Sequence, residues 1–228
     1  MKYIEKGDAP QYFIDEVKEL QTKLEKLNSK KEKSDVWNND FKGRRKLKEY
    51  MLENEQNWLC GYCEAKVTLD NSHIEHIKAK FIDYDNLTFD YLNLLVSCEG
   101  ICFSDNNEKL TCGHKKDTKG YKVNYALFLN PAKVKNIRKY FKYTDNFNIG
   151  ATQLSPQRAI ETIRVLNLGE QNNQLQEARK NALKTFKKSV RQINIKTKKP
   201  LKEIIIFLLE KENLAFISFL RYKFKMDK

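Results

Sequence analysis

Cys60-Gly61-Tyr62-Cys63 opens the stretch that decides the fold. Cys98, Cys102 and Cys112 follow, so that all five cysteines and all three histidines of the chain lie within residues 58–120. A tetrahedral zinc ion needs four soft ligands, which two turns often deliver as two close pairs. Cys60 and Cys63 form the first pair. We predict Cys98 and Cys112 as the second pair, with Cys102 as an alternative to either, and therefore expect a structural zinc knuckle.

These cysteines have two alternative uses. They could be buried free thiols, or residues 60–63 could be a redox pair, although such pairs normally sit in a thioredoxin-like βαβ setting that the sequence lacks. The 228-residue chain has no apolar run long enough to cross a bilayer and no signal-peptide core at its start. We therefore expect a cytoplasmic protein without a membrane partner, in which reduced cysteines favour metal over disulfides.

Candidate catalytic side chains lie between and after the cysteines. The first group is His73-Ile-Glu75-His76-Ile-Lys-Ala-Lys80, and the second starts at Asn93 in Asn-Leu-Leu-Val-Ser-Cys. The third is Cys112-Gly-His114-Lys115-Lys116. On a strand, Glu75 and His76 point to opposite faces, so that one can ligate a cation while the other faces a substrate. His73 lies outside this motif, and we expect no role for it.

These residue types suit phosphodiester hydrolysis. A neutral histidine is the natural general base near pH 7, and His76 is the candidate. A divalent cation, Mg²⁺ or Mn²⁺, can clamp the phosphate and stabilise the leaving oxygen. Lys115 or Lys116 could contact a phosphate. Asn93 could alternatively be a plain turn former.

The order C-x-x-C, acid-His, Asn-Leu-x-x-x-Cys, Cys-x-His-x-Lys resembles the HNH endonuclease motif on a zinc-stapled ββα-metal (His-Me) finger. The resemblance implies that Glu75 and His114 ligate the catalytic metal, and that Asn93 orients the His76 imidazole or joins the metal shell. The chain departs from the family pattern in three ways. Glu75 replaces the usual Asp, Gly113 separates a Cys and a His that are usually adjacent, and the loop between Cys98 and Cys112 is longer.

A narrower resemblance covers most of the chain and is densest over residues 56–120. Gln56-x3-Cys60-Gly-Tyr-Cys-Glu64, Ile74-Glu-His and Phe89-Asp-Tyr-x-Asn-Leu are similar to the HNH nuclease subunit (PtuB) of Septu anti-phage systems, which is also an effector of some retrons. This resemblance implies an ABC/RecF-like ATPase subunit (PtuA-like) as partner, in some systems within a retron complex. The chain itself has no G-x-x-x-x-G-K-[ST] nucleotide loop.

Apolar periodicity divides the chain into three zones. We expect an N-terminal helical extension at 1–57, with helices over 11–29 and 41–58 and a charged break at Lys30–Lys33. Residues 58–120 form the nuclease core, with short strands at Val67–Leu69 and Leu94–Val96. Residues 121–228 form a C-terminal helical region, in which Ser155-Pro156, Leu175 and Pro200 mark helix starts. The expected fold class is α+β and mainly helical, with a ββα-metal core.

The charge balance points to nucleic acid. The formal net charge is +13, which favours a polyanionic partner over the alternative of a merely lysine-rich composition. Residues 179–199 contain nine Lys or Arg and no acid. We expect Lys187, Lys188 and Arg191 to contact nucleic acid, unless this stretch is only a solvated helix face.

The sequence thus favours a metal-dependent HNH endonuclease that hydrolyses phosphodiester bonds in nucleic acid. As the effector of an anti-phage defence system, it would work with an ATPase subunit. The competing hypothesis is a non-catalytic zinc-knuckle module that binds nucleic acid through residues 179–199. The sequence does not distinguish a DNA substrate from an RNA substrate.

Overall fold

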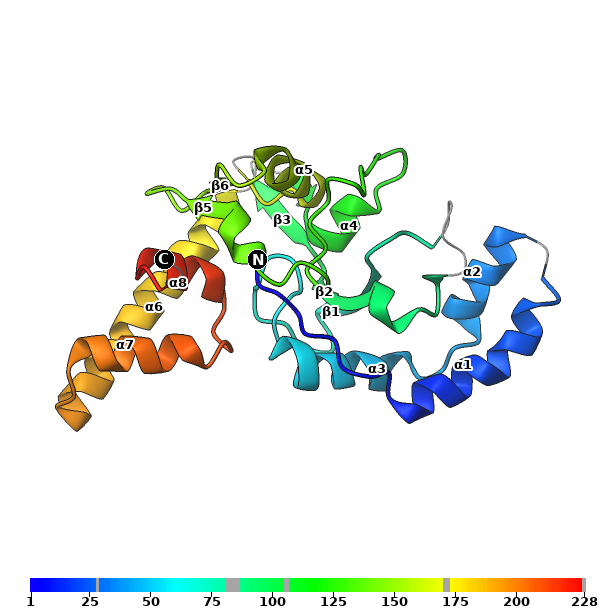
Figure 1. Cartoon of the computed structure of the whole chain (residues 1–228), viewed down its shortest axis with the longest axis horizontal. Coiled ribbons are helices and arrows are strands. Elements are labelled where there is room, and N and C mark those ends of the chain that lie inside the picture. The colour runs from blue at the N-terminus through cyan, green and yellow to red at the C-terminus, as the bar shows by residue number, and fades with distance from the viewer. Residues whose placement is uncertain (28, 81–86, 105–106, 170–172, 227–228) are drawn as a thin grey trace.

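The computed structural model describes residues 1–228 except 28, 81–86, 105–106, 170–172 and 227–228. Helices form both ends of the molecule, and small hairpins lie between them (Figure 1). The α-helices are α1 Gln11–Leu24, α2 Lys30–Asn39, α3 Arg44–Met51, α4 Cys112–Lys116, α5 Pro156–Leu166, α6 Asn173–Thr197, α7 Leu201–Glu210 and α8 Ile217–Lys223. The strands are β1 Ser72–His76, β2 Leu94–Cys98, β3 Ile101–Ser104, β4 Asn107–Leu110, β5 Phe141–Tyr143 and β6 Ile149–Ala151.

The N-terminal zone is helical as predicted, with one correction. The expected charged break at Lys30–Lys33 is the first turn of α2. Ser29 accepts a hydrogen bond from the backbone of Glu32, whose side chain bonds the Ser29 backbone in return. This capping box satisfies two backbone donors at the helix start and outweighs the repulsion among the lysines. After α3 the chain makes a π-helical turn over Leu52–Gln56 before reaching the cysteines.

The central zone contains the strand pair that carries the candidate motif. β1 and β2 are antiparallel, with Glu75 opposite Leu95 and His76 opposite Leu94. The helix α4 packs against β2. The predicted strand at Leu94–Val96 is therefore present, whereas Val67–Leu69 is not a strand and only an isolated bridge between Leu59 and Lys66 precedes β1. A β3–β4 hairpin occupies the long connection from Cys98 to Cys112.

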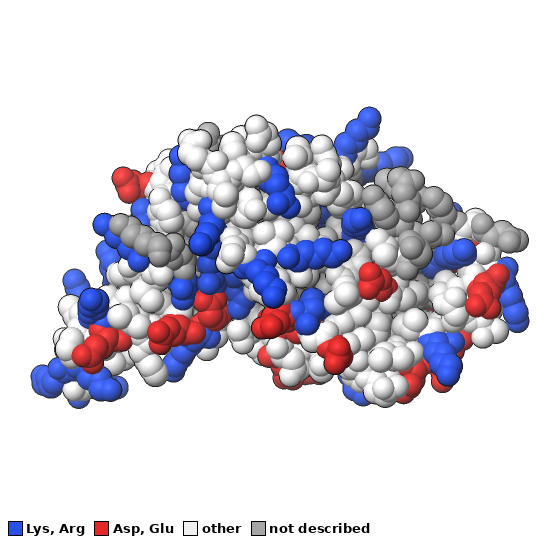
Figure 2. Space-filling model, viewed as in Figure 1, with Lys and Arg blue, Asp and Glu red and all other residues white. Residues whose placement is uncertain are grey.

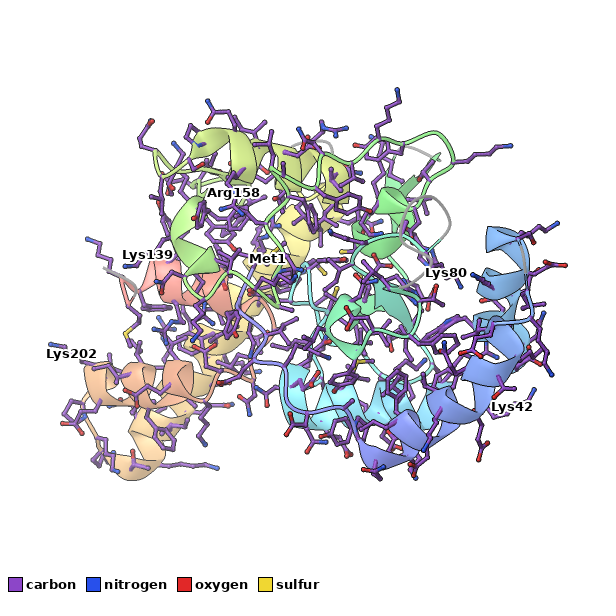
Figure 3. All side chains as sticks on the ribbon, turned by 45° about the vertical axis from the view of Figure 1, so that its right-hand side comes forward. Met1, Lys42, Lys80, Lys139, Arg158 and Lys202 are labelled. Carbon is purple, nitrogen blue, oxygen red and sulfur yellow. The ribbon has the colours of Figure 1, made fainter. Side chains whose placement is uncertain are left out.

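The C-terminal zone follows the predicted helix starts closely. α5 begins at Pro156 and ends before Asn167, which adopts a left-handed backbone conformation. The helix expected to start at Pro200 is followed by a second one, α8, because the backbones of Glu212 and Phe216 are left-handed and interrupt the helix between them. α6 and α7 extend away from the β1–β2 pair (Figure 1). Lys202, in the first turn of α7, points outward (Figure 3).

One hydrophobic core joins the three zones. Ile4, Leu52, Tyr62, Leu95 and Phe219 are each 1 % exposed or less and belong to a single buried cluster. Met1 lies inside the molecule among the side chains of the other zones (Figure 3). The chain thus combines helices with small sheets. No helix within the described residues is long and apolar enough to cross a membrane.

Candidate functional site

Four cysteines meet as the spacing predicted. Cys60, Cys63, Cys98 and Cys112 each offer a sulfur atom within 4.8 Å of all the others. The Sγ atoms of Cys63 and Cys98 are 3.8 Å apart, and those of Cys60 and Cys112 are 3.9 Å apart. A tetrahedron with zinc–sulfur bonds of about 2.3 Å has edges of about 3.8 Å. The cluster is therefore compatible with zinc and far too open for disulfides.

Buried contacts outside the cysteines hold the knuckle in shape. The Gln56 amide donates to the carbonyls of Leu59 and Val96 and accepts from the Val96 amide at 2.7 Å. It thereby fastens the turn before Cys60 to β2. At Gly61 a Cβ atom would lie 3.0 Å from the side chains of Ile4 and Leu95, so this position needs glycine for close packing.

Cys102 was the alternative ligand. Its backbone lies in β3, paired with Lys109, and its side chain is outside the described residues. The four cysteines of the cluster are those that the sequence analysis preferred.

Glu75 is buried on β1 and has three partners. The Lys116 ammonium lies 3.0 Å from Oε1, the Tyr62 hydroxyl donates to Oε1 at 3.1 Å, and His73 Nε2 lies 3.7 Å from Oε2. Burial works to raise the pKa of the Glu75 carboxyl, but Lys116 and then His73 outweigh it, so that this pKa is lowered. Glu75 is therefore a carboxylate held within the protein.

Lys116 corrects the prediction that it could contact a phosphate. Its side chain is fully buried between Glu75 and Asp117. Removing this ammonium would leave the Glu75 carboxylate buried without a countercharge, which is strongly destabilising. Although burial works to lower the pKa of Lys116, Glu75 and Asp117 raise it above the usual value. Lys116 thus balances the charge of Glu75.

His76 lies at the end of β1, on the face opposite to Glu75. Its ring is 5 % exposed and meets the Trp37 ring edge-on, with 4.6 Å between centroids. Nε2 lies 2.9 Å from the Thr88 carbonyl, so the tautomer that satisfies this oxygen has Nε2–H as donor and the lone pair on Nδ1. Burial lowers the pKa of His76 to about 4, which keeps the ring neutral at pH 7.

Asn93 braces the chain that leaves β1. Its carbonyl oxygen accepts from the Lys78 amide at 2.8 Å, and its NH₂ group donates to the carbonyls of Lys78 and Leu87. These contacts are with backbone groups, whereas the two predicted roles involved the His76 ring and a metal. In this arrangement Asn93 ties Lys78 to Leu87, which precedes Thr88 in the chain.

His114 lies beside two residues that the sequence analysis missed. Its Nε2 is 2.8 Å from the Glu99 carboxylate, and Glu99 is 3.6 Å from Nδ1 of His73. The second metal-compatible group among the described residues is therefore His73, Glu99 and His114. Strand alternation could have identified His73, since it shares a face with Glu75. No local signal marks Glu99, which follows Cys98 of the cysteine cluster in the chain.

The remaining candidates lie around α4 and on α6. Lys115 extends over the Tyr121 ring at 4.7 Å and lines a pocket of about 390 Å³. Lys187, Lys188 and Arg191 are exposed on α6, whereas Arg179 of the same stretch is buried and donates to backbone carbonyls. Lys and Arg side chains are scattered over the face in Figure 2, with Asp and Glu among them, and are not confined to one helix.

Comparison with known proteins supports an HNH endonuclease. No family model matches the chain. A 79-residue segment is 40 % identical to a protein of Vibrio cholerae serotype O1 biovar El Tor named "Retron Vc95 putative HNH endonuclease". The aligned segment covers 34 % of this chain and 37 % of that protein, so it spans little more than a third of the relative. The resemblance to the Septu subunit is not tested by this match and stays a prediction.

Proposed function

We propose that this protein is a metal-dependent HNH endonuclease that hydrolyses phosphodiester bonds in nucleic acid. The observation that carries the proposal is the four-cysteine cluster, which joins the strand pair bearing Glu75 and His76 to the helix bearing His114. The 40 % identity to a protein named as a retron HNH endonuclease supports the same activity. A zinc knuckle alone would not require a buried carboxylate–histidine pair on its central strand.

His76 accepts the proton of the attacking water in this proposal. The Thr88 carbonyl orients its ring, and burial keeps the ring neutral, so Nδ1 carries the lone pair that a general base needs. A divalent cation, Mg²⁺ or Mn²⁺ with Glu75 and His114 as predicted ligands, supplies charge neutralisation at the phosphate when bound. Lys116 keeps Glu75 ionised from within the protein.

The nucleic acid would follow the basic side of α6. Lys180, Lys184, Lys187 and Arg191 recur at four- and three-residue steps, so they project from one side of the helix. Phe186 and Val190 are buried on an adjacent side of the helix. Replacing Lys184, Lys187 and Arg191 with alanine should reduce the slope of log affinity against log salt by about two to three if each contacts a phosphate. An unchanged slope would remove α6 from the interface.

An anti-phage role with an ATPase subunit belongs to the same proposal. The resemblance of the sequence to the Septu subunit implies this role, and the name of the relative adds only that it belongs to a retron. Ile195, Leu201 and Phe207 are exposed apolar residues on α6 and α7, and they offer a surface for a partner protein. Co-purification with an ATPase encoded beside the chain would support the partnership, and a fully active chain in the absence of any such ATPase would contradict it.

One observation favours the non-catalytic alternative. His76 is covered by Trp37 and is 5 % exposed, as a purely structural histidine would be. Under this alternative the protein binds nucleic acid in a salt-sensitive manner and never cleaves it.

A cleavage assay distinguishes the two functions. Purified zinc-loaded protein is incubated with plasmid DNA and with structured RNA, in Mg²⁺, in Mn²⁺ and in chelator. We expect cleavage that needs the added cation and that falls at least about 100-fold in His76→Ala, the lower range for loss of a general base. Asp70→Asn, at an exposed residue, is the control. Equal cleavage by wild type and His76→Ala, or binding without any cleavage, would refute the proposal.

A further inference from the structure

Three side chains outside the cysteine cluster converge from three elements. His73 lies on β1, Glu99 follows β2, and His114 lies on α4. Each can offer one ligand atom within 4.8 Å of the other two. The Glu99 carboxylate bridges the pair, at 2.8 Å from His114 Nε2 and 3.6 Å from His73 Nδ1. The two imidazole rings are 4.3 Å apart between centroids.

The surrounding backbone keeps these groups together. The Glu99 amide donates to the Asn71 carbonyl at 3.2 Å, which fixes the carboxylate beside the start of β1. Gly113 has no side chain, and a Cβ there would lie 2.9 Å from His73 Nε2. The absence of this Cβ lets α4 approach β1 closely enough for His114 to reach Glu99.

His73 has one ring nitrogen that the protein leaves unsatisfied. Nδ1 is buried and makes no hydrogen bond within the described part of the chain, although it faces Glu99. An unpaired buried nitrogen is costly, and a bound ligand is a common explanation for one. A metal ion between Nδ1, Glu99 and His114 would satisfy this atom.

The other nitrogen of His73 faces a carboxylate. Nε2 lies 3.7 Å from Oε2 of Glu75, which Lys116 and Tyr62 hold in place. Metal-binding histidines usually donate their second N–H to a carboxylate, which fixes the ring and raises its basicity. Glu75 is thus oriented as an outer-shell partner of His73.

Solvent reaches this group more than the cysteine cluster, of which Cys60, Cys63 and Cys112 are buried. The side chains of Glu99 and His114 are each 42 % exposed and that of His73 is 25 % exposed. Three protein ligands at an accessible position leave coordination sites for water or a substrate, as in catalytic rather than structural metal sites. Two imidazoles and one carboxylate favour transition metals, whereas Mg²⁺ prefers oxygen ligands.

We propose that His73, Glu99 and His114 form a second divalent-metal site, selective for Mn²⁺, Co²⁺, Ni²⁺ or Zn²⁺ over Mg²⁺, with Glu75 as the outer-shell acceptor of His73. Metal binding here does not depend on the proposed function. A role of the bound metal in phosphodiester cleavage does rest on the proposed function. In that case Glu75 would position the metal ligand His73 instead of binding the metal itself.

The test measures binding in full-length protein that already contains one equivalent of zinc. Co²⁺ is titrated while absorption is recorded, because thiolate ligands give an intense charge-transfer band that imidazole and carboxylate ligands lack. We expect a second equivalent of Co²⁺ to bind with weak d–d bands only and to resist a hundredfold excess of Mg²⁺. Glu99→Gln and His114→Ala should each weaken this binding by more than about tenfold, since losing even an outer-shell partner costs about 10- to 100-fold.

Control variants separate the loss of this metal site from a general effect on the protein. Asp70→Asn removes an exposed carboxylate elsewhere and should bind Co²⁺ as wild type does. Both test variants alter partly exposed side chains, and an unchanged zinc content and circular dichroism would verify their folds. The absence of a second equivalent, unchanged affinity in both variants, or displacement by equimolar Mg²⁺ would overturn the proposal. A bound second metal without nuclease activity would instead refute only the proposed function.

Discussion

Gly113→Ala tests how tightly α4 and β1 are packed around the candidate site. The added Cβ would lie 2.5 Å from Oε2 of Glu75 and 2.9 Å from Nε2 of His73, both closer than real carbon contacts. The Glu75 carboxylate cannot swing away freely, because Lys116 and Tyr62 hold its other oxygen in the interior. Something in this buried network must therefore move.

Opposing effects determine the expected change in the free energy of unfolding of Gly113→Ala. Alanine within a helix gains about 1 kcal/mol over glycine. Overpacking costs about 1 to 3 kcal/mol if Glu75 keeps Lys116, and losing that buried pair costs about 3 to 5 kcal/mol. We expect a net destabilisation of about 2 kcal/mol, equivalent to a decrease of about 4 to 8 °C in Tm for a chain of this size.

The assay is thermal and urea unfolding in zinc-containing buffer, followed by tryptophan fluorescence. Gly150→Ala is the matched control, since its Cβ would meet only Lys142 side-chain atoms at 3.7 Å or more. That variant should be unchanged or stabilised by up to about 1 kcal/mol. If Gly113→Ala were as stable as wild type, the close packing of Glu75 and His73 against α4 would be wrong.

Three further predictions concern the knuckle, a buried ion pair and a histidine. Cys63→Ser should lose the zinc equivalent and have a lower Tm, whereas Cys102→Ser should retain its zinc when measured by elemental analysis. Equal loss of zinc in both variants would contradict the predicted ligand set. Glu55→Gln should lower the free energy of unfolding in urea by about 3 to 5 kcal/mol, because it leaves the buried Lys6 ammonium without its carboxylate partner at 2.6 Å. Glu53→Gln, at an exposed position, should change this free energy little. Burial lowers the pKa of His76 to about 4 from 6.5, so the unfolded chain takes up the proton first as pH falls. The free energy of unfolding should therefore decrease below about pH 6.5, by up to about 3 kcal/mol near pH 4, and His76→Phe should lack this part of the decrease; parallel pH profiles would rule it out.

The sequence predicted well where the signal is local. The C-x-x-C pair and the later cysteines identified the four thiols, and Ser155-Pro156 located the start of α5. The Ser29-x-x-Glu32 capping box was also legible, yet the lysines around it were interpreted as a break. A run of charged residues is therefore a weaker guide to where a helix begins than a capping residue.

The errors at the site come from long-range packing. Lys116 has the sequence context of a surface lysine, and only the fold brings it against Glu75, 41 positions earlier in the chain. Glu99 meets His114 because Cys98 and Cys112 of the cysteine cluster bring their neighbours together. The expectation of no role for His73 rests on its distance from the motif and stays a prediction, whereas the proposed metal site rests on the face of β1 that His73 shares with Glu75.

Chemical rescue of His76→Gly by imidazole tests the central claim most directly. The substitution removes the ring from between Trp37 and the Thr88 carbonyl and leaves a cavity of its own shape. We predict that His76→Gly loses cleavage of nucleic acid and that added imidazole restores a measurable part of it without accelerating the wild type. Undiminished cleavage by His76→Gly in the absence of imidazole would contradict the assignment of His76 as the general base.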